Sequence, residues 1–114
     1  MKRFIQEAAR TDILGQYQHY LNLGISEVAE RFLVAVNEAI DAVVAMPDAG
    51  APKHFENPQL EGLRTWPIKG FDEFRVYYIT NPKTIIVVRI LHGKRDVQSI
   101  MDEQGVDEEP QLQS

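Results

Sequence analysis

The chain has 114 residues, which is enough for one hydrophobic core and one domain but not for two. Its hydrophobic content of 44% and charged content of 25% are those of an ordinary globular protein, and the lack of cysteine excludes disulfides, thiolate zinc sites and thiol nucleophiles. The net charge of −5 conceals a cationic segment, residues 62–95, in which seven Lys or Arg residues stand against two acids, so the acidic total does not exclude an anionic partner.

The N-terminal residues alternate weakly between polar and apolar, and residues 2–8 are predicted to form a short strand. They lack the apolar run of about 7–15 residues that marks a signal peptide. No later stretch reaches the length of a membrane-spanning helix. We therefore expect a cytoplasmic protein.

Two helices are predicted next. The first covers residues 11–23, with Thr11 as its N-cap and Gly24 in the left-handed position that ends it. The second begins with Ser26 as its cap and ends before Pro47. Because the connection is so short, the two helices should form an antiparallel hairpin. An apolar stripe runs along the second helix and consists of Val28, Phe32, Ala35, Val36, Ala39 and Val43.

A connector rich in proline, glycine and asparagine follows over residues 47–58 and is predicted to be irregular. Asp96 is expected to cap a last helical turn. The order β-α-α-β-β-β predicts an α+β fold with a helical hairpin packed on one small antiparallel sheet. Three strands joined by short turns are predicted to form the antiparallel meander of this sheet, over residues 62–68, 73–80 and 84–92.

The last two strands carry arginines between apolar residues. Pairing Thr80 with Thr84 would set Arg75 directly across from Arg89. Two like charges in that position repel each other unless acidic side chains or an anionic partner neutralise them. Alternation places one set of side chains toward the helical hairpin: Phe74, Val76, Tyr78, Ile86, Val88 and Ile90. The opposite face, predicted to be open for docking, holds Arg75, Tyr77, Ile79, Ile85, Val87, Arg89 and Leu91.

Four cations could act together, namely Arg75, Arg89, Lys94 and Arg95. Such a cluster can hold a phosphodiester and stabilise charge that develops in a transition state. His92 could shuttle protons beside them, although a hydrogen bond to neighbouring backbone is the simpler reading. No spacing of histidines and acids suggests a metal site, so neither metal nor cofactor is predicted. The alternative for Arg75 and Arg89 is pairing within the fold, with Glu73, Asp96 or Glu7.

Two segments, LRTWPIKGFDEFRVYYI and TIIVVRILHGKRDVQSIM, resemble the RelE/ParE superfamily of bacterial type II toxins, and the resemblance extends over residues 4–101. The stretch RILHGKRDV is most similar to the ParE, or plasmid-stabilisation, branch. The resemblance implies a toxin domain over residues 1–101 and a toxin–antitoxin hetero-oligomer with a cognate antitoxin. Residues 102–114 are acidic and are predicted to be a disordered tail.

ParE-like members are generally inhibitors of DNA gyrase, so the resemblance implies a toxin that causes growth arrest by binding gyrase or its DNA and carries out no chemistry itself. The predicted target-binding residues are Arg75, Tyr77, Arg89, Lys94 and Arg95. The antitoxin is expected to cover the helical hairpin and the sheet edge, where apolar side chains would bind it unless they belong to the core. The candidates for this contact are Tyr17, Tyr20, Leu23 and Leu33.

Two alternatives remain open. RelE-like members cleave mRNA on the ribosome without a metal, through arginines and a C-terminal tyrosine. Arg75 and Arg95 match the two arginines, with Lys94 and His92 beside them, but the tyrosine falls at Met101, and a thioether cannot act as a base. The other alternative is a homologue that has lost its toxicity and only binds an antitoxin.

Overall fold

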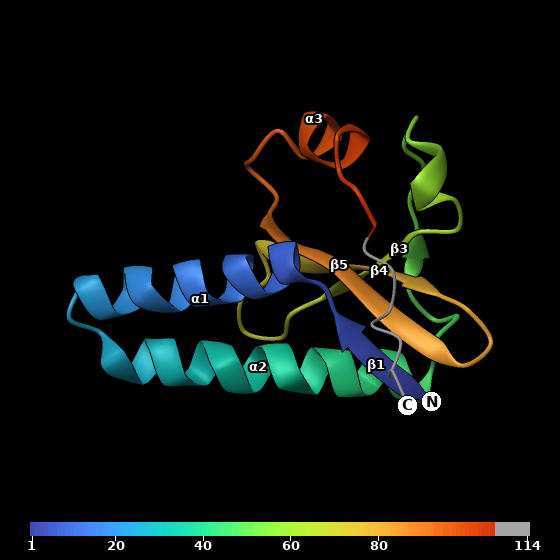
Figure 1. Ribbon diagram of the computed structural model, residues 1–114. Coiled ribbons are helices and arrows are strands. Elements are labelled where there is room, and N and C mark those ends of the chain that lie inside the picture. The colour runs from blue at the N-terminus through green and yellow to red at the C-terminus, as the bar shows by residue number, and fades with distance from the viewer. Residues whose placement is uncertain (107–114) are drawn as a thin grey trace, which may run out of the picture.

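The computed structural model describes residues 1–106, in which a five-stranded sheet lies between two long helices and a smaller layer formed by the connector and a short helix (Figure 1). None of the helices described has the combination of length and hydropathy needed to cross a membrane. In chain order, the elements are β1 (Lys2–Ile5), α1 (Glu7–Asn22), α2 (Ser26–Ala45), β2 (Ala51–Pro52), the 3₁₀ turn η1 (Pro58–Leu60), β3 (Arg64–Pro67), β4 (Phe74–Thr80), β5 (Thr84–His92) and α3 (Val97–Asp102).

The first helix begins earlier than the sequence predicts. β1 ends at Ile5, Gln6 has an extended backbone, and α1 begins at Glu7 rather than after a cap at Thr11. The side chain of Gln6 is fully buried, and its Nε2 donates to the carbonyl oxygen of Val88 at 2.9 Å. This bond to β5 fixes the junction between β1 and α1. The sequence has no local capping pattern that would predict the start of the helix there.

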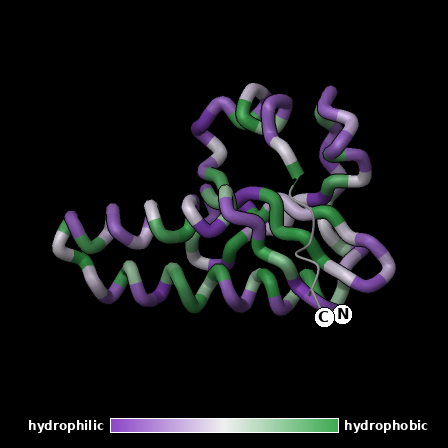
Figure 2. Tube along the Cα trace, in the orientation of Figure 1, coloured by the Kyte–Doolittle hydropathy of each residue, from purple (hydrophilic) through white to green (hydrophobic). Residues whose placement is uncertain are grey.

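The bounds of the second helix and the turn before it agree with the prediction, but the predicted cap does not: the N-cap position is Ile25, and no side chain among the described residues caps the helix. α2 begins at Ser26 and ends ahead of Pro47, and Gly24 has a φ of +76°, a left-handed conformation that glycine adopts without strain. Hydrophobic and hydrophilic residues alternate regularly along α2 (Figure 2), whereas in α1 only Ala9 is buried. The buried residues of α2 are Ala29, Phe32, Val36, Ala39, Ile40 and Val43.

The α+β class and the helical hairpin are confirmed, but the sheet is mixed rather than antiparallel. The strand order is β1-β5-β4-β3-β2, and β3, β4 and β5 form the predicted antiparallel meander. β1 pairs in parallel with β5, from Lys2 opposite Thr84 to Ile5 opposite Val87. β2 adds an edge strand from within the connector, which was predicted to be irregular. β1 was predicted as a strand, over residues 2–8, but its parallel pairing was not, and β2 was not predicted at all. Both strands are short and find their partners only through the tertiary fold.

The register between β4 and β5 differs from the prediction because the turn is shorter. Asn81 pairs with Thr84, and the Oδ1 atom of Asn81 accepts the backbone N–H groups of Lys83 and Thr84. Thr80 therefore lies opposite Ile85. The predicted pairing of Thr80 with Thr84 is wrong, because a two-residue turn shifts β5 by one position.

A bulge then shifts the register again. Tyr78 pairs with Val87 and Tyr77 with Arg89, which leaves Val88 as the extra residue on β5. Arg75 consequently lies opposite Leu91, so the predicted Arg75–Arg89 pair does not form. The faces predicted for β4 are right, but four positions of β5 exchange faces. The ones that turn toward the helices are Ile85 and Val87, and the ones that turn away are Ile86 and Val88.

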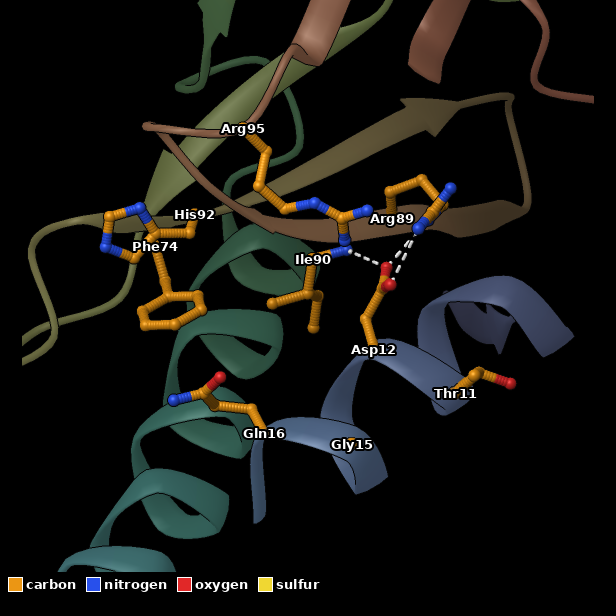
Figure 3. A pocket seen from close by; sticks show the side chains of 9 residues that line it. All are labelled: Thr11, Asp12, Gly15, Gln16, Phe74, Arg89, Ile90, His92 and Arg95. Carbon is orange, nitrogen blue, oxygen red and sulfur yellow. Dashed lines mark hydrogen bonds and ion pairs between the residues drawn. The ribbon is translucent and has the colours of Figure 1, made fainter. Parts of the chain in front are cut away.

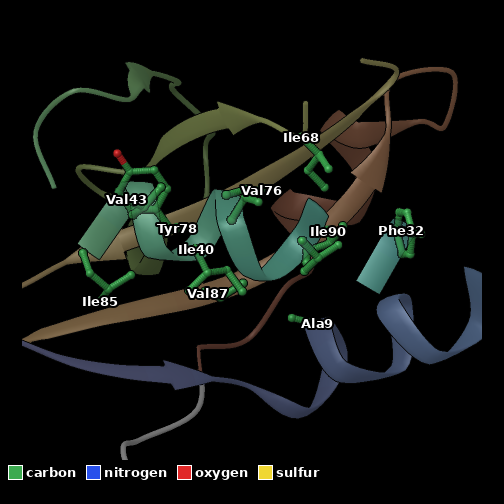
Figure 4. Packing of buried hydrophobic residues seen from close by; sticks show 12 residues of the cluster. Ala9, Phe32, Ile40, Val43, Ile68, Val76, Tyr78, Ile85, Val87 and Ile90 are labelled. Atoms are coloured by element: carbon green, nitrogen blue, oxygen red, sulfur yellow. The ribbon is translucent and has the colours of Figure 1, made fainter. Parts of the chain in front are cut away.

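The main core lies between the helical hairpin and the sheet (Figure 4). Phe32 is its aromatic centre, with edge-to-face contacts to Phe71 and Phe74 at centroid distances of 5.2 and 5.4 Å. Around it lie fully or almost fully buried side chains from α1, α2 and the meander, among them Ala9, Ile40, Val43, Ile68, Val76, Tyr78, Ile85, Val87 and Ile90.

The opposite face of the sheet is covered, not open as predicted. The connector, η1 and α3 pack on it and form a second hydrophobic cluster, on the side away from α1 and α2 in Figure 1. Tyr77, predicted to line an open face, is only 4% exposed. The prediction failed because α3 and residues 53–63 carry enough apolar side chains to seal the sheet. The buried members of this cluster are Leu60, Leu63, Tyr77, Val88, Leu91 and Met101.

Hydrogen bonds hold the segment after α3 against the connector. The Nδ2 atom of Asn57 donates to the carbonyl oxygens of Met101 and Gln104, and the N–H of Val106 donates to Gln59. Residues 102–106, which the sequence assigns to a disordered tail, are thus anchored. The rest of the predicted tail, residues 107–114, lies outside the described residues, so the domain boundary stays a prediction.

Candidate functional site

Arg89 forms a bidentate ion pair with Asp12 of α1 (Figure 3). Its Nε and Nη2 atoms donate to the two carboxylate oxygens of Asp12 at 2.7 Å each, and its Nη1 donates to Gln104 at 2.9 Å. The side chain of Arg89 is 15% exposed and that of Asp12 is 8% exposed. The hydrogen bonds that Arg89 donates to Asp12 raise the pKa of the Arg89 guanidinium. Asp12 also satisfies the edge of β5 beyond the part that pairs with β1, because its carboxylate accepts the backbone N–H of Ile90 at 3.0 Å.

The internal partner of Arg89 is therefore Asp12, rather than the Glu7, Glu73 or Asp96 considered from the sequence. This pairing satisfies the guanidinium within the fold. Its predicted part in target binding stays a prediction.

Arg75 lines a pocket of about 440 Å³ between the connector, β4 and α3. We call this the Arg75 pocket, and its lining residues are Lys53, His54, Phe55, Arg75, Tyr77, Gly93, Val97 and Gln98. The Nε atom of Arg75 donates to the buried Oγ1 of Thr65 at 3.2 Å. Burial raises the pKa of the Tyr77 hydroxyl, and the charge of Arg75 partly opposes this shift. Among the residues that the structure describes, no acidic side chain lines the pocket.

His92 is held by two hydrogen bonds. Its Nδ1 accepts the backbone N–H of Lys94 at 3.0 Å, so in the neutral ring Nε2 carries the proton, and Nε2 lies 2.7 Å from a carboxylate oxygen of Glu73. The hydrogen bond from His92, its charge and then the charge of Lys94 lower the pKa of Glu73. Part of this arrangement is the backbone contact predicted as the simpler reading for His92.

The four residues of the ribonuclease alternative are divided between different places. Arg75 lines the Arg75 pocket, whereas His92 and Arg95 line a pocket of about 380 Å³ beside α1, together with Asp12 (Figure 3). Lys94 and Arg95 are exposed on the turn after β5. Met101, at the place expected for the catalytic tyrosine, is fully buried in the second cluster.

The residues predicted to bind an antitoxin have different surroundings. Tyr20 is half-buried and packs against Phe32, with a centroid distance of 5.8 Å, so it belongs to the edge of the core. The hydroxyl of Tyr17 donates to Glu30 across the hairpin at 3.0 Å. Leu33 is half-buried, and Leu23 is 59% exposed. Exposed apolar residues that the sequence analysis did not single out lie nearby and are Leu14, Ile25 and Val34.

Sequence reasoning also missed Lys53 and His54, which bring a cation and an imidazole to Arg75. The only signal was their basic character within an otherwise neutral or acidic connector. Throughout residues 1–106, no group of three or more His, Asp or Glu side chains is placed to hold a metal ion.

Comparisons with known proteins agree with the predicted resemblance. The family described as "ParE toxin of type II toxin-antitoxin system, parDE" matches residues 4–97. A solved structure, "Chromosomal ParDE TA system from P. aeruginosa", has a similar fold, with a TM-score of 0.65, 24% sequence identity and coverage of 81% of this chain and 95% of that one. No curated protein sequence matches. Because the family match spans most of the chain, this protein belongs to the ParE toxin family of type II toxin–antitoxin systems.

Proposed function

We propose that this toxin inhibits DNA gyrase and that a cognate antitoxin neutralises it within a toxin–antitoxin hetero-oligomer in the cytoplasm. The observation that carries the proposal is the family match over residues 4–97, which contains the whole cationic segment and the turn after β5. Gyrase and its DNA substrate offer the anionic groups that such a segment attracts.

Exposed cations support a binding role for the turn after β5. Lys94 and Arg95 are exposed, and no carboxylate oxygen within residues 1–106 lies within 4.0 Å of either side-chain charge. An unpaired surface charge of this kind steers association with an anionic partner. We therefore place the gyrase contact at this turn, with Arg75 and Tyr77 on the adjoining pocket, and keep Arg89 as a residue that supports the turn.

The same geometry favours binding over RNA cleavage. A metal-free ribonuclease must bring its cations to one phosphodiester together with a proton-transfer group. Here Arg75 and Arg95 line different pockets, and the position of the expected tyrosine is the buried Met101. The ribonuclease remains the second candidate because Arg75, Lys94 and Arg95 are all present.

The helical hairpin is the proposed antitoxin surface. Leu23 and Val34 are 59% and 55% exposed, and Leu33 and Tyr17 lie on the same hairpin. Covering exposed apolar side chains with a partner helix or strand lowers the free energy of the complex. We expect Leu23→Glu or Val34→Glu to weaken co-purification with the product of a neighbouring antitoxin gene, and Asp48→Lys, on the exposed loop after α2, to leave it unchanged.

Supercoiling assays with purified toxin test the target. The wild-type chain should inhibit gyrase and trap cleaved DNA at micromolar concentration, and Lys94→Ala with Arg95→Ala should raise the toxin concentration needed by roughly tenfold at low salt. The matched control is Lys69→Ala with Lys83→Ala, which removes two exposed charges from other turns. Full gyrase activity with no trapped complex would remove gyrase as the target.

Growth experiments separate the alternatives. If cells that express the toxin stop growing while their transcripts acquire cuts at codon positions, and Arg95→Ala abolishes the cuts, the ribonuclease is correct. If cells grow normally without antitoxin, the chain is a non-toxic antitoxin-binding homologue.

A further inference from the structure

We propose that the Arg75 pocket is a binding site for a phosphate monoester, of the kind carried by a mononucleotide or by the 5′ end of a nucleic acid strand. The proposal stands on the geometry of this pocket alone, and it holds whether or not gyrase is the target.

The charge of the lining selects an anion. Lys53 and Arg75 contribute two cations, His54 a third group that can be charged, and none of the lining residues within 1–106 carries a carboxylate. The pocket beside α1 differs, because there the carboxylate of Asp12 already neutralises Arg89. An anion that enters the Arg75 pocket therefore meets positive charge, with no competing acid from the described part of the chain.

Arg75 is oriented so that its two terminal nitrogens are available. Its Nε is held by Thr65 at 3.2 Å, and neither Nη1 nor Nη2 has a partner within residues 1–106. A guanidinium anchored at Nε presents its terminal N–H groups as a fork. Phosphate oxygens accept such a fork in two parallel hydrogen bonds.

The hydroxyl of Tyr77 supplies an independent observation. Tyr77 is only 4% exposed and lines the pocket, yet its hydroxyl makes no hydrogen bond within the described part of the chain. No sealed side-chain polar atom there lacks a partner, so this hydroxyl must open toward the cavity. Buried phenols usually have a partner. The neighbouring Tyr78 does, because its hydroxyl donates to Pro47 at 2.9 Å and accepts from Gly50 at 3.1 Å.

The size of the cavity indicates more than a bare ion. At about 440 Å³ the pocket falls within the range of roughly 300–1,000 Å³ found for small-molecule sites. The rings of Phe55 and His54 line it and offer surfaces on which a base can stack. A phosphate has more acceptor oxygens and more charge than a carboxylate. It can therefore accept hydrogen bonds from the Arg75 guanidinium, the Lys53 ammonium and the Tyr77 hydroxyl at the same time.

Titration of the full chain by calorimetry and by amide NMR tests this site. The probes are inorganic phosphate, adenosine 5′-monophosphate, adenosine, and a short oligonucleotide with and without a 5′-phosphate. We expect both phosphorylated organic probes to bind saturably and to shift the amides of Arg75, Gly93 and Gln98, with adenosine and the unphosphorylated strand at least about tenfold weaker. Tighter binding of the strand than of the mononucleotide identifies a nucleic acid end as the ligand, and equal binding identifies a free nucleotide.

Matched variants test the assigned contacts. Tyr77→Phe removes only the free hydroxyl and should weaken binding of the mononucleotide about tenfold, and Lys53→Ala and Arg75→Lys should each weaken it several-fold. Tyr78→Phe and Lys83→Ala are the controls, because these residues lie outside the pocket, and both should bind as the wild type does. The proposal fails if no phosphate probe saturates at millimolar concentration, if Tyr77→Phe binds normally, or if an acidic peptide competes as well as the nucleotide.

Discussion

The Asp12–Arg89 pair provides the sharpest test of how this fold is held together. Asp12→Asn keeps the size of the side chain but removes the charge and one of two acceptor oxygens. Those oxygens accept three hydrogen bonds, two from Arg89 and one from the backbone of Ile90. A single amide oxygen cannot serve all three donors, and the amide nitrogen would face donors. At least one buried donor therefore loses its partner.

The cost follows from burial. Removing one partner of a buried ion pair typically costs about 3–5 kcal/mol. Arg89 keeps its bond to Gln104 and is 15% exposed, so we expect the lower end, about 3 kcal/mol. Urea unfolding should show this loss as a fall in the midpoint of about 1–3 M, given a typical slope of about 1–3 kcal/mol/M.

The exposed pair between Arg3 and Asp41 is a matched control. Its N–O distance is also 2.7 Å, but the side chains are 39% and 64% exposed. Because water screens this pair, Asp41→Asn should cost less than about 1 kcal/mol. If Asp12→Asn and Asp41→Asn destabilise the protein equally, burial does not determine the strength of the Arg89 pair and the reasoning is refuted.

Three further predictions rest on single contacts. Tyr78→Phe should lower the free energy of unfolding by about 1–3 kcal/mol, because the buried amide of Gly50 loses its acceptor, while Tyr77→Phe should stay within about 0.5 kcal/mol in the same urea titration. Gly50→Ala should cost about 1–3 kcal/mol in thermal unfolding, because the added methyl group would meet the Tyr78 hydroxyl; an unchanged midpoint would contradict this packing. NMR titration should give Glu73 a pKa below its ordinary value of 4.5, and His92→Gln should raise it again. Since the folded-state pKa is the lower one, the stabilisation by this pair is complete above about pH 4.5 and is lost as the pH falls through the folded-state pKa; a Glu73 pKa that His92→Gln leaves unchanged would refute the pairing.

Local signals predicted the helical hairpin and the longest strand well. The apolar stripe of α2 has one repeat over many residues, and Gly24 marks the turn before it. β5 has the predicted bounds, Thr84–His92, because β-branched residues fill it and a short turn precedes it. α1 was predicted less well because it buries little apolar surface, and its start depends on Gln6 reaching β5.

The candidate site was only partly predictable. Arg75 and Tyr77 were expected to lie together because they share a face of one strand, and both line the Arg75 pocket. Lys53 and His54 join them from a connector that gives no periodic signal. The expected pairing of Arg75 with Arg89 failed because one turn residue and one bulge residue change which side chains meet.

By itself the sequence determined the α+β class, the helical hairpin, the antiparallel meander and the ParE resemblance, because periodicity, turn chemistry and motifs act over a few neighbouring residues. The tertiary structure alone decided the parallel β1–β5 pairing, the cover over the second face and the partner of Arg89. Asp12 and Arg89 stand 77 residues apart in the chain. Their contact depends on where α1 lies along the edge of β5, and that placement results from packing of the whole core rather than from any local preference.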